Sequence, residues 1–556
     1  MESINRFDVC VIGAGPAGMV SAIELAESGL SVALVESGGE QFHSFAQELS
    51  KSEILSPESH SDMADAVRRG LGGTSGFWGG RCVPLDNVDF IQRSNIDLSG
   101  WPISHAELDP YYQSACSYLG VKSPDFKVES CKNMATAKLP LSSKFEGSSR
   151  ISSSQLERWS MEPKIWRVLG NKIKNNKKIT LFKNKTCVGF YQSEGFSNVS
   201  SASLRATKKD GSGIEQIYAN VFILACGGVE STRLVLASLE DHNGLKVRGS
   251  KHVGHFYMGH PSGKIADIQL FGNSHETIYG FEKDGDVYVR RRITFTEETL
   301  KDEQLLNIAF WLDNPNISEW RHGSGILSVA YLALTAPFVS HMLAPAAIRK
   351  RVAGGQQLNR FEHLKNCIFN PVDTVSFVIR FILSRYFLKP RLPGFFTYSK
   401  SNKYALHYHA EQVPNYDSCI FLSEKKDALG LKRAVISLVW SQKDIDSIIK
   451  AHRVLDDELK KKGIGQLVYK YSDGELDCAI RAQALDGYHQ IGTLRMASSS
   501  EQGVTDGNGL IFGTDNFYVA SSAIFPTSGQ ANPTLALIAL VVRQANHISN
   551  ALKDKG

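Results

Sequence analysis

The 556-residue sequence predicts an α/β protein of two interlocked domains, and three observations support this prediction. The chain is longer than one hydrophobic core usually supports. Near its start, an apolar run, a glycine-rich turn, a helical pattern and a second apolar run follow one another. A later apolar run at 221–228 ends in paired glycines before another helical pattern. Buried apolar strands that alternate with helices are typical of a parallel sheet with helices on its faces.

The N-terminal unit predicts a nucleotide site. Residues 7–12 (FDVCVI) read as a buried strand, residues 13–18 (GAGPAG) as a tight turn, and residues 19–28 as a helix. A second strand at 30–35 then ends at Glu36. This strand–turn–helix–strand order is the context in which a GxGxxG pattern binds a dinucleotide.

Each residue of this pattern has a physical role. Gly13 permits the tight turn, Gly15 lets the backbone approach a pyrophosphate, and Gly18 lets the helix pack closely on the strand. The helix N-terminus offers free N–H groups to the phosphates. Glu36 is expected to accept hydrogen bonds from ribose hydroxyls and to repel a 2′-phosphate.

A second glycine-rich stretch at 69–81 (RGLGGTSGFWGGR) holds six glycines and cannot be a regular helix. It suits a backbone that passes close to a large flat ligand; the alternative is a surface loop, against which the aromatic pair at 77–78 argues. The ligand contacts expected here are Gly73, Thr74, Ser75, Trp78 and Gly79. A strand is expected at 178–188.

Near the C-terminus, residues 487–496 read GYHQIGTLRM, and a strand at 517–520 leads to an SGQANPT segment and a long apolar-faced helix at 535–552. The order GxGxxG…E, GGTSxxWGG, ACGGxES, HxxGTxRM and NPT resembles the glucose–methanol–choline (GMC) family of FAD-dependent oxidoreductases. The motifs span residues 7–552, although 267–406 has little of the resemblance.

The resemblance implies bound FAD and a histidine facing the flavin, here His489, with Asn532 as its partner. In this family the hydride of a CH–OH group moves to flavin N5 while the hydroxyl proton leaves. Histidine, whose ordinary pKa is about 6.5, is suited to accept that proton at neutral pH, and an asparagine amide can orient the same oxygen. Outside this motif, His489 would be interpreted as a structural histidine and Asn532 as a turn residue.

The resemblance also implies further FAD contacts, at Val188 near the adenine and at Ala225, Ser521, Pro533 and Thr534. Ser521 stands where some relatives carry an acid. Phe77 stands where some relatives bond FAD covalently through a histidine, which predicts non-covalent FAD. The histidines at 252, 255 and 260 are expected to be structural, and no metal site is predicted.

The resemblance implies an FAD domain from 1–95, 178–263 and 480–556, and a substrate domain from 96–177 and 264–479 with a mixed or antiparallel sheet. The substrate is expected to be a small alcohol, such as a sugar, polyol or glycoside. The electron acceptor is left open among oxygen, a quinone and a protein. An FAD-containing lyase of the same fold is one alternative, and a second GxGxxG motif, as an NAD(P)H-linked reductase would need, is not found.

Charge is concentrated in one segment. Residues 319–400 hold eleven Lys/Arg against three acids, an excess of eight, while the whole chain carries +5. Apolar runs at 326–348 and 375–388 alternate with these basic residues, which disfavours nucleic-acid binding. The segment could be core helices of the substrate domain, a peripheral membrane contact through 326–391, or a mouth for a phosphorylated or lipid-linked sugar.

The compartment is expected to be the cytoplasm, with peripheral contact to the inner face of the membrane as an extension of that prediction. None of the nine cysteines lies in a CxxC pair, and residues 1–6 lead directly into a strand, without the charged and apolar regions of a secretion signal. Both features favour a reducing environment.

Overall fold

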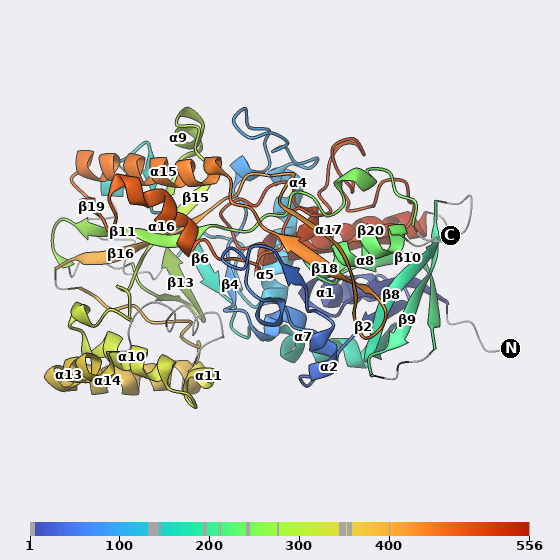
Figure 1. Cartoon of the computed structure of the whole chain (residues 1–556), viewed down its shortest axis with the longest axis horizontal. Helices are drawn as coiled ribbons and strands as arrows, with labels where there is room; N and C mark the ends of the chain where they lie inside the picture. Colours follow the sequence, from blue (N-terminus) through green and yellow to red (C-terminus); the bar gives the residue numbers. More distant parts are fainter. Residues whose placement is uncertain are drawn as a thin grey trace.

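The computed structural model describes residues 6–131, 144–145, 147–192, 197–209, 211, 213–240, 245–274, 277, 279–343, 352, 359–399 and 401–554. Figure 1 shows two sheet regions side by side along the long axis of the molecule. The region on the right contains β2, β10 and β20, the region on the left contains β11 and β16, and α10, α13 and α14 form a separate layer at its edge.

The first region is built on a seven-stranded sheet in the order β7-β2-β1-β10-β9-β8, with β20 added beside β10. Its parallel strands come from distant parts of the chain: β1 (Arg6–Ile12), β2 (Val32–Glu36), β7 (Ile179–Lys183), β10 (Glu215–Leu224) and β20 (Phe517–Val519). Helices α1 (Pro16–Glu27) and α17 (Thr534–Lys553) pack against each other beside it. The apolar runs that predicted buried strands are confirmed, because residues 9–12 of β1 and all of β2 are buried.

The single strand expected at 178–188 is wrong. The chain forms two strands there, β7 and β8 (Lys185–Gln192), separated by Asn184 at a φ of 57°. Asparagine tolerates this left-handed conformation, so the chain turns without a glycine signal. As a result β7 pairs with β2, whereas β8 pairs antiparallel with β9 (Val199–Ala206).

The second region is an antiparallel sheet in the order β19-β11-β16-β15-β14-β5. Its strands are β5 (Ile151–Ser152), β11 (Ser262–Leu270), β14 (Ile293–Phe295), β15 (Ile308–Asp313), β16 (Lys403–Ala410) and β19 (Gly465–Tyr469). Helix α15 (Gln442–Lys461) covers it and begins at Ser441 with a capping box to Asp444. The α/β fold class with a second, antiparallel sheet is therefore confirmed, while the domain boundaries stay a prediction.

Two smaller sheets join these regions. One follows the order β12-β13-β6-β4 and the other β17-β18-β3. Their strands are β3 (Glu53–Ile54), β4 (Arg81–Cys82), β6 (Leu156–Trp159), β12 (Glu282–Asp284), β13 (Val287–Arg291), β17 (Cys419–Lys426) and β18 (Lys432–Ser437). The last helix before the C-terminal site is α16 (Leu476–Gln483), and α8 (Gly228–Glu240) follows β10.

Between β15 and β16 the chain forms a helical insert, as the apolar runs there predicted. It contains α10 (Gly325–Thr335), α11 (Ser340–Leu343), α13 (Arg360–Phe369), α14 (Pro371–Ile382) and the π-helical turn η9 (Leu383–Phe387). The basic cluster at 349–351 lies outside the described residues. Among the described helices, none alone is long and apolar enough to cross a membrane. The pair formed by α13 and 371–387, bent by 98°, meets that test by length and composition.

A buried ion pair connects segments 318 residues apart. Arg93 donates to both carboxylate oxygens of Glu411, at 2.7 and 2.5 Å, and the backbone N–H of Asn307 donates to the same carboxylate. Burial alone would lower the pKa of Arg93, but the adjacent Glu411 outweighs it and holds that pKa above its ordinary value. Glu411 directly follows β16, so this pair fixes one end of the antiparallel sheet.

Arg93→Met is expected to lower the free energy of unfolding by about 3–5 kcal/mol, because it leaves a buried carboxylate without a counter-charge. Guanidinium unfolding followed by tryptophan fluorescence measures the change. The exposed pair of Lys122 and Asp286 offers a control, and Lys122→Met should leave the unfolding curve unchanged. A cost for Arg93→Met as small as that of the control would contradict the assigned role.

Candidate active site

The first glycine motif forms a tight turn against β10. Gly13 has a φ of 104°, and a side chain there would come within 2.5 Å of the carbonyl oxygen of Ala225. A side chain at Gly18 would collide with the backbone of Gly13. By contrast, a Cβ at Gly15 would meet no atom within 4 Å, so the backbone there faces open space at the start of α1. The turn therefore leaves one glycine and one helix N-terminus available to a phosphate.

Glu36 lies at the end of β2 with 6% of its surface exposed. Its carboxylate accepts hydrogen bonds from the backbone N–H groups of Ala14 and Gly38, both at 2.9 Å. The carboxylate thereby joins the glycine turn to the segment that follows β2. Oε1 accepts from both Ser37 Oγ and the N–H of Gly38, whereas among the described residues Oε2 accepts only from Ala14, so its second acceptor position remains for a ribose hydroxyl.

The second glycine loop packs on the first. Gly73, with a φ of 53°, begins a 3₁₀ turn (Gly73–Gly76), and a Cβ there would lie 2.9 Å from the Cα of Gly15. Two of the side chains that were expected to contact a ligand instead donate hydrogen bonds to backbone carbonyls of the protein. Ser75 Oγ donates to the carbonyl of Gly72 and Trp78 Nε1 donates to the carbonyl of Pro163.

The rest of this loop follows the same pattern. Thr74 Oγ1 accepts from the backbone N–H of Arg68 at 3.3 Å. At Gly79 a Cβ would meet no atom within 4 Å. What this loop offers a flat ligand is therefore its backbone, held in shape by its own side chains.

The other expected FAD contacts are spread around the same sheet. Val188 lies in β8 where the pairing register with β9 shifts, so the ladder skips it. Ser521 follows β20 and accepts from the backbone N–H of Ala523 at 3.0 Å. Pro533 precedes Thr534, the first residue of α17, and no side chain caps that helix N-terminus. Ala225 directly follows β10, so Ala225, Ser521 and the start of α17 lie at the carboxyl ends of β10 and β20, where nucleotide-binding sheets bind their ligand, whereas Val188 lies within β8.

The structure brings His489 and Asn532 together, as the motifs predicted. Asn532 Nδ2 donates to His489 Nε2 at 2.9 Å. His489 Nδ1 lies 3.1 Å from Asp486 Oδ2, so the hydrogen on this ring belongs on Nδ1 and Nε2 carries a lone pair. The carbonyl oxygen of the Asn532 side chain is buried and has no hydrogen-bond partner among the described residues. A buried acceptor without a donor indicates that a ligand donor completes it.

Asp486 was missed in the sequence. It is 2% exposed and also accepts the backbone N–H groups of His260, Tyr488 and His489, at 2.7, 2.9 and 3.2 Å. Burial alone would raise its pKa, but His489, His260 and these hydrogen bonds outweigh burial and hold the pKa of Asp486 well below its ordinary value. The carboxylate is therefore ionised and orients the imidazole. The three-residue spacing to His489 was the available signal.

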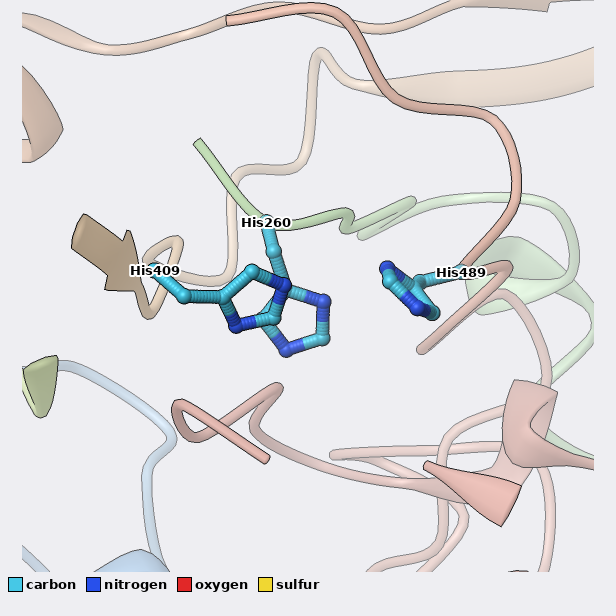
Figure 2. A group of neighbouring side chains, drawn as sticks. All are labelled: His260, His409 and His489. Atoms are coloured by element: carbon cyan, nitrogen blue, oxygen red, sulfur yellow. The ribbon is translucent and has the colours of Figure 1, made fainter. Parts of the chain in front are cut away.

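Two further histidines complete the site, and neither was predicted there. His260, expected in a structural turn, stacks on His409 with ring centroids 4.3 Å apart, and His489 meets His260 edge-on at 4.7 Å. Figure 2 shows the two stacked rings beside His489. Burial lowers the pKa of His260 to about 3 and that of His409 well below its ordinary value, so both are uncharged at neutral pH.

The three imidazoles are close enough to share a metal ion, since their ligand atoms lie within 4.8 Å of one another. Three histidines are a donor set that zinc accepts. However, both nitrogens of His489 already have partners, and His409 Nδ1 donates to the carbonyl of Gln530 at 2.7 Å. In this arrangement His489 therefore has no ring nitrogen free for a metal ion.

A cluster of arginines lies beside the histidines. Arg81 and Arg290 share the fully buried Glu157, and both guanidinium groups lie on the ring of Trp311, with centroid distances of 4.3 and 5.0 Å. The ring centroids of Trp311 and His409 are 6.4 Å apart. Arg81 Nη2 is buried without a hydrogen-bond partner among the described residues. Arg81 also contributes to the lowered pKa values of His260 and His409, which places its charge within electrostatic reach of the site.

The chain matches two family models. Residues 8–61 match an FAD binding domain, which covers the glycine turn and Glu36. Residues 414–540 match the C-terminal domain of GMC oxidoreductases, which covers Asp486, His489 and Asn532.

Named relatives agree with these matches. Paromamine 6'-oxidase of Streptomyces fradiae is 21% identical over 99% of this chain and 92% of its own length. 6'''-Hydroxyparomomycin C oxidase of Streptomyces lividus is 31% identical over 21% of this chain, and the match spans only 24% of that protein.

Solved structures share the fold. Formate oxidase has a TM-score of 0.54 at 16% identity and is covered over 100% of both chains. Pyridoxine 4-oxidase from Mesorbium loti has a TM-score of 0.55 at 14% identity and is covered over 97% of this chain and 98% of its own. Two parts of the chain therefore match an FAD binding domain and the GMC oxidoreductase C-terminal model, and the whole chain shares its fold with these oxidases.

Proposed function

We propose that this protein oxidises a CH–OH group of a sugar, polyol or related small alcohol to a carbonyl, with His489 as the base. The contact between His489 and Asn532, beside the FAD-binding fold, is the observation that carries the proposal. Two relatives named as oxidases of paromamine and of hydroxyparomomycin C support an alcohol on a sugar-like substrate.

FAD, when bound, supplies the two-electron acceptor for the hydride of the alcohol carbon. The glycine turn, Glu36 and the start of α17 would hold it, and the open space before Gly15 and Gly79 fits a ligand there. Phe77 in place of a linking histidine supports non-covalent binding. Oxygen, a quinone or a protein then reoxidises the flavin.

The chain's own residues handle the proton. The Asn532 amide donates to His489 Nε2 in this structure; when an alcohol hydroxyl takes the place of that donor, the Nε2 lone pair takes the hydroxyl proton and the released amide can bond to the alcohol oxygen. Asp486 stabilises the imidazolium that forms, because its ionised carboxylate lies 3.1 Å from Nδ1. His260 and His409 remain neutral and so add no opposing charge. The hydroxyl proton and the carbon hydride leave the alcohol together, which balances the oxidation to a carbonyl.

His489→Ala is expected to lower kcat by about 10²–10⁴-fold, the usual contribution of a general base, without loss of FAD. Flavin absorbance after gel filtration measures the cofactor, and anaerobic mixing with sugars and alcohols measures the rate of flavin bleaching. Asn532→Ala should mainly raise KM and slow bleaching less. Product formation by the wild type without any bleaching would instead identify a lyase and overturn the proposal.

Asp486→Asn tests the positioning role separately. The variant keeps the shape of the side chain but removes the negative charge, so the protonated imidazole is less stable. The acidic limb of the kcat/KM pH profile should therefore move to lower pH, and kcat should fall by about tenfold or more. An unchanged pH profile with reduced FAD content would show a merely structural role.

A second candidate is that the substrate carries a phosphate or carboxylate. The arginine cluster favours it, since Arg81 and Arg290 share Glu157 and the charge of Arg292 acts on the same carboxylate, with Asp86 and Asp89 also within electrostatic reach of Arg292. Arg292 donates to Gln530 and Gln155, but its Nε is buried without a hydrogen-bond partner among the described residues. Guanidinium donors left free near a reacting centre suit an anionic group.

Arg81→Met is expected to raise KM for a phosphorylated sugar by about 10–100-fold, the value of a lost charge-assisted hydrogen bond. The KM for the matching neutral sugar should stay within a factor of about two. Steady-state kinetics on the two sugars measures the difference. Equal losses on both sugars, with FAD retained, would exclude an anion contact at this arginine.

A further inference from the structure

The helical insert presents an apolar stripe to solvent. Along α14 and η9 the exposed residues recur at helical spacing, and their exposed fractions lie between 43% and 78%. They are Val372, Val375, Ile379, Ile382 and Tyr386. A surface helix of a soluble protein normally turns such a stripe toward the core. Here the stripe faces outward, which is the reverse of the usual arrangement.

Helix α13 repeats the same pattern. Phe361, Leu364 and Ile368 are spaced by three and four residues, and each is about half exposed or more. Phe369 and Phe387, at the ends of α13 and η9, are also largely exposed. Contiguous exposed apolar surface on this scale marks a place where a protein contacts something other than water.

The inner face of the insert combines buried polar groups with the buried side chains of Leu327 and Tyr331. Ser328 of α10 bonds to His363 of α13 at 3.0 Å, and Asn366 Nδ2 donates to the same serine at 3.1 Å. Thr374 Oγ1 of α14 donates to the carbonyl of Asn370 at 2.6 Å. Ser328 and His363 are buried, so the hydrogen bonds of Ser328 with His363 and Asn366 link α10 to α13, whereas the Thr374 bond lies within the start of α14. A helix group with buried interhelical hydrogen bonds and apolar side chains on its outer face is suited to a lipid environment.

Basic side chains surround the apolar stripe. Arg360, Arg380, Lys389 and Arg391 are exposed. Of the acids described in this segment, Glu362 pairs with Lys365 and Glu319 lies near Arg321, which leaves Asp373. The surface is therefore net positive around an apolar centre. This combination complements the anionic head groups and acyl chains of a bilayer surface.

We propose that α13, α14 and η9 form a membrane-docking surface that inserts its apolar stripe into the interface of an anionic bilayer. The 98° bend between α13 and 371–387 breaks any straight span, and it allows both helices to lie along the membrane surface. Figure 1 shows these helices as a layer at the edge of the molecule, away from the nucleotide-binding sheet. Docking would therefore leave the FAD-binding region in solution. The proposal does not depend on the identity of the alcohol.

Flotation of the full-length, FAD-loaded protein with vesicles tests this surface. The wild type should float with vesicles of phosphatidylcholine and phosphatidylglycerol, and much less with phosphatidylcholine alone. Ile379→Asp should lower binding by about tenfold or more, because it places a charge in the apolar stripe. Ile214→Asp is the matched control, since Ile214 and Ile379 are both 54% exposed and Ile214 lies on the other half of the molecule. The control should float like the wild type.

Charge and self-association are tested in the same preparation. Lys389→Glu with Arg391→Glu should abolish the preference for phosphatidylglycerol, and raised salt should do the same to the wild type. FAD content and circular dichroism must match the wild type. Two results would overturn the proposal. One is a wild type that does not float. The other is a lipid-free dimer that Ile379→Asp converts to a monomer, because the stripe would then bind a second copy of this chain.

Discussion

The geometry of the histidine site depends on the hydrogen bonds of one buried carboxylate, that of Asp486. It accepts hydrogen bonds from three backbone N–H groups and from one imidazole N–H. One of these donors, the N–H of His260, lies 226 residues earlier in the sequence, and the others belong to Tyr488 and His489. A charged group this deeply buried is stable only when such donors surround it. The same bonds fix the orientation of His489 and the path of the chain at His260. Positioning and charge are therefore provided by one side chain.

The two large sheets each contribute different residues around this carboxylate. The nucleotide-binding sheet supplies the glycine turn, Glu36 and the ends of β10 and β20, which converge at its carboxyl edge. The antiparallel sheet supplies His409 from β16 and Trp311 from β15. The loops carrying His489 and Asn532 lie where the sheets meet. The buried Arg93–Glu411 pair fixes the end of β16 next to His409, so it links stability to the site.

The helical insert follows a different rule from the rest of the chain. The cores of both sheets bury their apolar side chains. In the insert, Ser328 bonds to His363 and Asn366 beside the buried Leu327 and Tyr331, while many phenylalanine, isoleucine and valine side chains are exposed on the outer face. The hydrophobic effect in water does not favour such a surface. A lipid interface removes that cost, which gives the inversion a physical reason.

The sequence by itself determined the local features whose cause is local. The GxGxxG motif predicted the turn, together with its flanking strands and Glu36. Each glycine is required by backbone geometry within a few residues of it. The motifs around His489 and Asn532 predicted a pair that the fold brings to 2.9 Å. The turn at Asn184 was missed, since asparagine signals a left-handed residue only weakly.

Only the tertiary structure decided which distant residues meet. His260 and His409 are 149 positions apart, and no spacing pattern connects them; they stack because β11 and β16 are neighbours in one sheet. Arg81 and Arg290 meet across Glu157 for the same kind of reason. Hydropathy revealed an apolar, basic insert, but periodicity does not say which face of a helix is covered. Packing against the neighbouring helices decides which face is covered, and here it leaves the apolar stripe exposed to solvent.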